Sequence, residues 1–167
     1  MNSSDSFRLM AGYNRWINEK LYALCATLSD EERKRDRRAF FRSIHGTLNH
    51  LLLTDRAWLG RFTGRPFSFR SLDQELHADF DELRRERPST DAAIEEFCRD
   101  LTEERLNADI VYATTAGKGH SHPLAPALLH LFNHEAHHRG QITTLLSQLG
   151  IDPGGTDVIA YYREMGK

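Results

Sequence analysis

The sequence has few cysteines, no long hydrophobic run and almost no net charge, and each absence excludes a class of protein. Its two cysteines, Cys25 and Cys98, stand alone without CxxC spacing, so we expect small core residues in a reducing interior rather than a disulfide framework. No segment approaches the roughly 18 apolar residues that a membrane span needs, and the first residues lack the basic start and apolar run of a secretion signal. We therefore expect a cytoplasmic protein.

Charge and length narrow the choice further. The formal net charge is -2, with 28% charged and 40% hydrophobic residues, so no excess of one sign points to nucleic acid or a membrane surface as a partner. The chain of 167 residues is long enough for one sizeable core and too short for two domains of ordinary size. We expect residues 1–167 to form a single domain.

Apolar residues recur at helical spacing over most of the chain. The pattern predicts four long helical regions, at residues 6–28, 40–62, 72–106 and 125–149. Pro88 should kink the third region or split it in two, and Gly150 should end the fourth. Ser29 has the spacing of a capping box for a short helical turn, and the tail after Gly150 should add a short C-terminal helix.

Residues 109–124 differ from the rest of the chain. DIVYATTAGKGHSHPL contains a β-branched stretch, a Gly-Lys-Gly turn and Pro123, which together predict a short hairpin or extended loop before the last long helix. Four long helices with almost no strand indicate an all-α fold, a four-helix bundle.

The segment HLFNHEAHHRGQ, residues 130–141, holds four of the nine histidines. The apolar residues around it define the inward face of its helix independently. His138 falls near the middle of that face and His134 roughly 60° from its centre, whereas His130 and His137 lie roughly 100° to 120° away. Because His134 and His138 are one turn apart on one side, they form either a hydrogen-bonded pair in the core or two ligands of one metal ion.

HEAHH also matches HExxH, in which two histidines bind zinc and the glutamate acts as general base of a peptidase. Glu135 is thus one catalytic candidate. The longer peptidase motif fails because position 141 is Gln, and an all-helical chain of this size has little room for the strand edge that aligns a peptide. We therefore rank a metallopeptidase below other metal-dependent functions.

The second helical region supplies a third candidate ligand and a second candidate carboxylate. His45 and His50 both lie there, and helical-wheel geometry does not decide between them. Asp55 falls inside the apolar stripe of the same helix, where a carboxylate needs a partner. It should either pair with an arginine across the bundle or orient a ligand histidine, which makes it the other catalytic candidate.

Four segments, YNRWINEKL, SIHGTLNHLLLTDRAWLGRF, DIVY and HLFNHEAHHRGQ, together resemble the DinB family, which is related to YfiT-like thiol transferases. The resemblance covers nearly the whole chain. It implies a four-helix bundle with up-down-down-up connections, often dimeric, and a divalent metal bound by His50, His134 and His138. It gives no general-base role to Glu135.

The resemblance also implies what the site does. Three neutral imidazoles leave a divalent ion with its charge and an open position, which suits activation of a thiol or water. We expect zinc first, with nickel or iron as alternatives, and a small-molecule or thiol substrate for a metal-dependent transferase or hydrolase. A non-catalytic, metal-binding stress-response protein is the competing expectation. The sequence leaves open the roles of His45, His120, His122, His130 and His137.

Overall fold

The computed structural model describes residues 2–114 and 117–166. Within these ranges the chain is mostly helical, with one small two-stranded sheet. The elements in order are α1 (Ser3–Ala26), α2 (Asp30–Lys34), α3 (Ile44–Thr63), α4 (Phe80–Arg99), α5 (Glu103–Asn107), β1 (Asp109–Ala113), β2 (Gly119–Pro123), α6 (Leu124–Gln148) and α7 (Val158–Glu164). Among the described residues, no helix combines the length and the apolar character that crossing a membrane requires.

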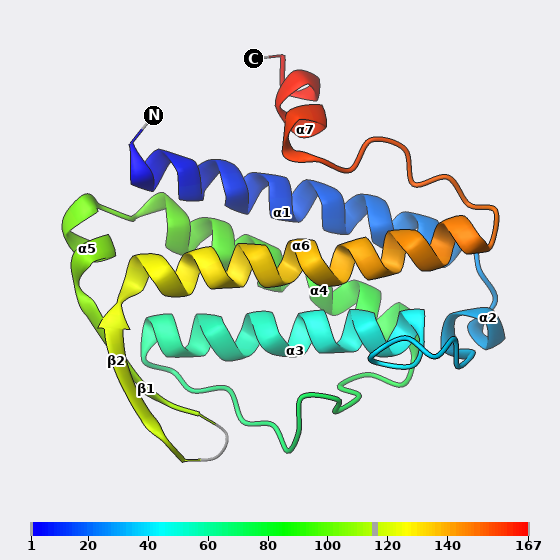
Figure 1. Ribbon diagram of the computed structural model, residues 1–167, viewed down its shortest axis with the longest axis horizontal. Coiled ribbons are helices and arrows are strands. Elements are labelled where there is room, and N and C mark those ends of the chain that lie inside the picture. Colours follow the sequence, from blue (N-terminus) through cyan, green and yellow to red (C-terminus); the bar gives the residue numbers. More distant parts are fainter. Residues whose placement is uncertain (1, 115–116, 167) are drawn as a thin grey trace.

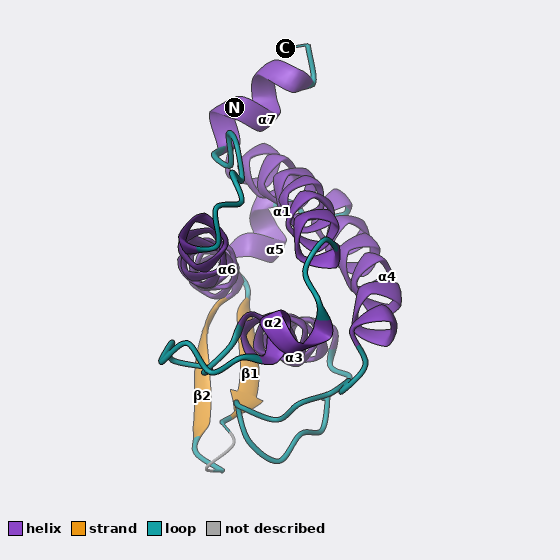
Figure 2. Cartoon of the chain, turned by 90° about the vertical axis from the view of Figure 1, so that its right-hand side faces the viewer, coloured by secondary structure: helices purple, strands orange, loops and turns teal. Residues whose placement is uncertain are grey.

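The long helices α1, α3, α4 and α6 lie side by side (Figures 1 and 2). Helices α1 and α3 each contact both α4 and α6. The C-terminal helix α7 lies against α1, where Tyr161 packs on Tyr13 and Trp16. The prediction of a helical fold is confirmed, as is the short C-terminal helix.

The helix ends follow from their capping residues. Ser43 accepts a hydrogen bond from Gly46 N and thereby starts α3, so the prediction that this helix begins at residue 40 was wrong. Helix α6 ends as predicted: Gly150 has a φ of 78°, and Ile151 N donates to Leu146 O at 3.0 Å in a Schellman arrangement. Ser29 caps α2, also as predicted.

The third helical region differs from its prediction at both its start and its middle. Residues 64–79 form a loop, and α4 begins only at Phe80, after the capping Asp79. The split at Pro88, one of the two predicted outcomes, is absent because α4 runs through this proline, and the predicted region instead breaks after Arg99, before the separate helix α5. Pro88 is exposed, so water can replace the hydrogen bond that its ring cannot donate.

The segment before α6 is the predicted hairpin. Strands β1 and β2 pair antiparallel, with Asp109 opposite Pro123 and Ala113 opposite Gly119. Thr114 N donates to Lys118 O at 2.8 Å at the start of the turn. The hairpin contacts α3 through β1 and α6 through β2, so it covers one end of the helices (Figure 1).

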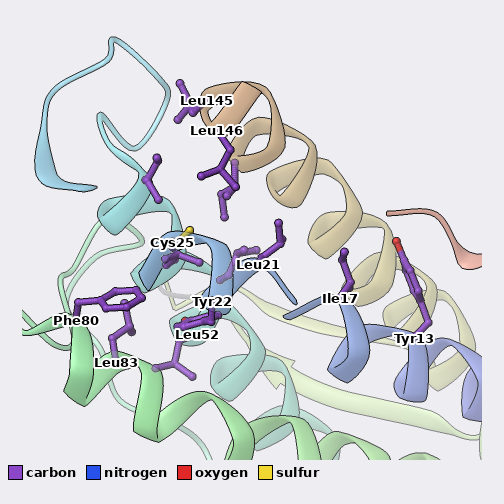
Figure 3. Packing of buried hydrophobic residues seen from close by; sticks show 14 of the residues in the cluster. Tyr13, Ile17, Leu21, Tyr22, Cys25, Leu52, Phe80, Leu83, Leu145 and Leu146 are labelled. Atoms are coloured by element: carbon purple, nitrogen blue, oxygen red, sulfur yellow. The ribbon is translucent and has the colours of Figure 1, made fainter. Parts of the chain in front are cut away.

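The core has two hydrophobic clusters. Cys25 belongs to the first, at the end of the molecule where α1 ends (Figure 3), and Cys98 belongs to the second, near the hairpin. Both cysteines are fully buried, as expected for core residues, and burial raises the pKa of each thiol to about 12. On α6 the buried Glu135 and Arg139 lie between Phe132 of the second cluster and Ile142 of the first, so a polar layer separates the two.

Candidate metal centre

Three histidines from two helices meet at one point. His50 comes from α3, and His134 and His138 come from successive turns of α6. One ligand nitrogen from each lies within 4.8 Å of the others, and the Nε2 atoms of His50 and His134 are 3.1 Å apart. Two nitrogens bound tetrahedrally to one zinc ion at the usual distance are about 3.3 Å apart. The spacing therefore fits a shared ion.

Hydrogen bonds at the other ring nitrogen orient two of these imidazoles. Nδ1 of His50 lies 2.7 Å from Leu72 O, and Nδ1 of His138 lies 2.8 Å from Gln141 Oε1. Both partners are acceptors, so each Nδ1 carries the proton and each Nε2 keeps a free electron pair. This is the outer hydrogen bonding that orients histidine ligands in metal sites. Nδ1 of His134 is buried and has no partner among the described residues.

The surroundings keep these histidines uncharged. Burial lowers the pKa of His50 to about 4. Burial, followed by the nearby His138, lowers the pKa of His134 to about 3, and burial also lowers the pKa of His138. Neutral imidazole is the form that binds a metal ion, so at neutral pH the cluster is ready to bind without releasing protons from its rings.

An aromatic ring forms one wall of the cluster. Phe41 stacks on His50 with ring centroids 3.7 Å apart and meets the edge of His138 at 5.4 Å. The loop that carries Phe41 turns through Arg38 and Arg42, which have φ values of 57° and 65°. The side chain of Asp36 accepts hydrogen bonds from both residues. The loop thus holds an apolar ring over two of the three imidazoles.

The histidines that the sequence left without a role lie outside this cluster. His45 contacts His77 O and Glu75 instead. The other four form two groups: His130 and His137 are exposed on α6, and His120 and His122 pack on Tyr112 of the hairpin.

The two candidate catalytic carboxylates point into the polar layer between the hydrophobic clusters. Asp55 forms an ion pair with Arg87 at 2.6 Å, and Oε2 of Glu135 lies 3.2 Å from Nη1 of Arg139. All four are buried. Burial, followed by the neighbouring Asp55 carboxylate, raises the pKa of Glu135 well above its usual range. Asp55 has the arginine partner across the helices that was one of its two expected roles.

This arrangement bears directly on the peptidase alternative. A general base in an HExxH helix has to face the open side of the metal. Glu135 is fully buried and lies within hydrogen-bond distance of Arg139 from the next turn of α6. The HEAHH match thus places its two histidines in the cluster and its glutamate in the core.

Three partners of the cluster were not assigned from sequence. Leu72 and Phe41 were missed because both were expected to lie in helices. In a helix the carbonyl of residue 72 would accept a backbone hydrogen bond instead of one from His50, and the ring of residue 41 would not be expected to stack on His50. Gln141 entered the sequence argument only as the residue that breaks the longer peptidase motif. Its position three residues after His138, one helical turn along the same face, was the signal available for it.

Comparisons with known proteins agree on one family. The sequence profile described as "DinB family" matches residues 1–165. Protein DinB of Bacillus subtilis (strain 168) is 26% identical over 153 residues, covering 89% of each chain. The crystal structure of a DinB-like protein from Bacillus cereus superposes with a TM-score of 0.59 at 22% identity, covering 86% of this chain and 91% of that one.

Proposed function

The chain belongs to the DinB family, and from this premise we propose that it binds one divalent metal ion through Nε2 of His50, His134 and His138. The observation that carries the proposal is the hydrogen bonding of Leu72 O and Gln141 Oε1 to two of the rings. Histidines that were merely packed in a core would not need Nε2 of His50 and Nε2 of His134 to approach to 3.1 Å, with a ring nitrogen of His138 within 4.8 Å of both.

The donor set supports a borderline metal. Three neutral imidazoles suit zinc, nickel and iron, and we propose zinc first. When bound, such an ion supplies Lewis-acid chemistry, which favours the deprotonated form of a thiol or water and stabilises developing negative charge. The protein's own residues orient the three rings, keep them neutral and shield one side of them with Phe41.

We further propose that the site serves transfer of a low-molecular-weight thiol to a small electrophile. Both candidate carboxylates are paired with buried arginines, which disfavours a hydrolytic reaction with Glu135 or Asp55 as the general base. Thiol transfer needs less from the protein, because lowering the pKa of the thiol creates the nucleophile. The same pairing also favours the competing function, a metal-binding protein of stress responses without catalysis.

Metal titration of the apoprotein tests the binding proposal. Protein purified without nickel resin and stripped with chelator should bind about one zinc ion per chain in a calorimetric titration. His134→Ala should reduce the affinity by at least about 100-fold, since it removes one of three ligands. His120→Ala removes a histidine of the hairpin, outside the cluster, and should bind like wild type. Equal affinities in both variants would overturn the proposal.

A turnover assay separates the two functions. The zinc-loaded protein is incubated with a panel of low-molecular-weight thiols and an electrophile such as an epoxide or an unsaturated ketone. Transfer that requires metal and is lost in His134→Ala supports the transferase. Stoichiometric zinc binding without metal-dependent transfer would support the non-catalytic metal-binding function instead.

Three broader expectations are part of this proposal. We propose that the long helices form the four-helix bundle with up-down-down-up connections of the family, that residues 1–167 form one domain, and that the chain is a cytoplasmic homodimer. Sedimentation velocity of the purified protein tests the dimer. A single species of twice the 19.2 kDa chain mass should dominate at micromolar concentration.

A further inference from the structure

A second hollow lies apart from the histidine cluster, where the hairpin meets the C-terminal half of α3. It is a cavity of about 330 Å³ between α3, the loop at residues 64–69 and strand β1. Figure 1 shows this loop leaving the end of α3 beside which the hairpin lies. The volume lies at the lower end of the range of about 300–1,000 Å³ found for small-molecule sites.

The walls of this cavity are largely apolar. Phe67 and Phe69 stack with centroids 6.4 Å apart. The other apolar side chains of the lining are those of Ala57, Pro66, Val111, Tyr112 and Ala113, and Ser68 and Thr114 add two hydroxyl groups. Gly60 allows the loop to close against the helix, because a Cβ there would lie only 2.6 Å from Arg65 O. The cavity is thus a built feature of the chain, with room for a flat or compact apolar group.

Among the described residues that line the cavity, Arg61 is the one with a charge. Its guanidinium carbon lies 4.4 Å from the ring centroid of Trp58 and 4.9 Å from that of Tyr112. The two rings fix the plane of the guanidinium through cation–π contacts. Within residues 2–114 and 117–166, its N–H groups have neither an ion pair nor a hydrogen bond.

The guanidinium of Arg61 is partly buried. Burial lowers the pKa of Arg61, and no carboxylate among the residues lining the cavity offsets that cost. Arginine presents its N–H donors as a rigid fork that matches a carboxylate with two hydrogen bonds. The absence of a carboxylate partner for Arg61 and the apolar walls together indicate the chemical class of ligand that the cavity fits.

We propose that this cavity binds a small organic carboxylate with an aromatic or apolar body, and that the carboxylate pairs with Arg61. The inference goes beyond the proposed function, because none of the three clustered histidines lines the cavity. The two sites are neighbours nonetheless: the ring of His130 lies 5.1 Å from Trp58 and 5.8 Å from His134.

Nuclear magnetic resonance titration with a matched pair of probes tests the proposal. The acid 3-phenylpropionate carries the required charge, and 3-phenylpropionamide has the same shape without it. The chain has two tryptophans, of which Trp58 touches Arg61 and Trp16 packs against Tyr161. The acid should shift the indole N–H signal of Trp58 in a saturable way and leave that of Trp16 in place, whereas the amide should shift neither.

Three variants complete the test. Arg61→Gln should weaken binding of the acid by about tenfold or more, because it removes a charge-assisted pair of hydrogen bonds. Arg65→Gln removes a nearby exposed arginine outside this cavity and should bind like wild type. His138→Ala should also bind like wild type, which keeps this inference separate from the metal proposal.

Several results would overturn the inference. These are no saturable shift at millimolar acid, equal shifts with acid and amide, or unchanged binding in Arg61→Gln. Arg61→Lys keeps the charge without the fork. If Arg61→Gln unfolds, intermediate binding by a folded Arg61→Lys supports the proposal, and wild-type binding by it contradicts the role of the fork.

Discussion

At the scale of single residues, a substitution of Gln141 distinguishes a metal centre from histidines that are merely packed in a core. Its Oε1 accepts the Nδ1 proton of His138, and loss of such an outer partner usually weakens a metal site by about 10- to 100-fold. Gln141→Leu should lower zinc affinity by that amount, measured by competition with a chelating dye. Gln148→Leu, an exposed position on the same helix, is the control. Unchanged affinity in Gln141→Leu would show that the hydrogen bond does not serve the metal.

His50 makes the stability of the apoprotein depend on pH. Its pKa is about 4 in the folded protein and about 6.5 in an unfolded chain. Between these values the unfolded chain binds the extra proton, so the stabilisation is complete above about pH 6.5 and is lost as the pH falls towards 4.

Urea unfolding with chelator present measures this effect. From pH 7.5 to pH 5 the wild type should lose about 1 to 2 kcal/mol through His50. His50→Gln cannot take up that proton and can still donate to Leu72 O. Over the same pH range its free energy of unfolding should therefore fall by about 1 to 2 kcal/mol less than that of the wild type. Parallel pH profiles for the two proteins would contradict the assigned pKa.

At the scale of elements, the loop between α3 and α4 is as important to the site as the helices. Asn49 is buried, and its Oδ1 accepts hydrogen bonds from Leu76 N at 2.8 Å and His77 N at 3.0 Å. These bonds anchor the loop that brings Leu72 O to His50. Asn49 therefore holds in place the loop whose carbonyl at Leu72 orients the neighbouring candidate ligand His50.

Asn49→Ala should release this loop. Amide hydrogen exchange of Leu76 and His77 should accelerate, because both amides lose their acceptor, and zinc affinity should fall as His50 loses its orientation. Gln74 accepts a hydrogen bond from Arg70 N within the exposed part of the loop, so Gln74→Ala is the matched control and should leave zinc binding unchanged. Slow exchange and full affinity in Asn49→Ala would refute the anchoring role.

The elements also show where sequence reasoning succeeded and where it stopped. Helical periodicity located the four long helices, and the i, i+4 spacing placed His134 and His138 on one side of α6, because both depend only on local geometry. The choice of His50 over His45 came from family resemblance. Residues 72–79 were mistaken for helix because the fold of this loop depends on Asn49, which lies 27 residues before Leu76 in the chain. The wall formed by Phe41 was missed because residue 41 was placed in a helix that in fact begins at Ile44.

At the scale of the whole molecule, a buried charged layer joins the long helices between two apolar clusters. Arg87 of α4 contacts Asp55 of α3 and Asp91 of its own helix at 2.6 and 2.7 Å, and Asn14 and Asn18 of α1 donate to Asp91. Removing one partner leaves the others charged and buried. This layer fixes how the helices align, and the alignment brings α3 and α6 together at the histidines.

Asp55→Ala tests whether that carboxylate is structural. It should destabilise the protein by about 3 to 5 kcal/mol in denaturant unfolding, because Arg87 loses a buried partner. Glu19→Ala, which breaks an exposed pair with Arg15, should cost less than about 1 kcal/mol. The folded Asp55→Ala protein should still bind one zinc ion per chain. Wild-type stability combined with lost zinc binding would show that Asp55 serves the metal site and not the stability of the fold.

The central claim is that His50, His134 and His138 bind one metal ion, and anomalous diffraction tests it most directly. Crystals of protein purified without nickel resin are grown with zinc, and data are collected on both sides of the zinc absorption edge. The account predicts one strong peak about 2.0 to 2.1 Å from the three Nε2 atoms, with Gln141 and Leu72 O still bonded to the opposite ring nitrogens. A zinc-saturated crystal with no peak between these rings, or with zinc bound at other histidines, would contradict it.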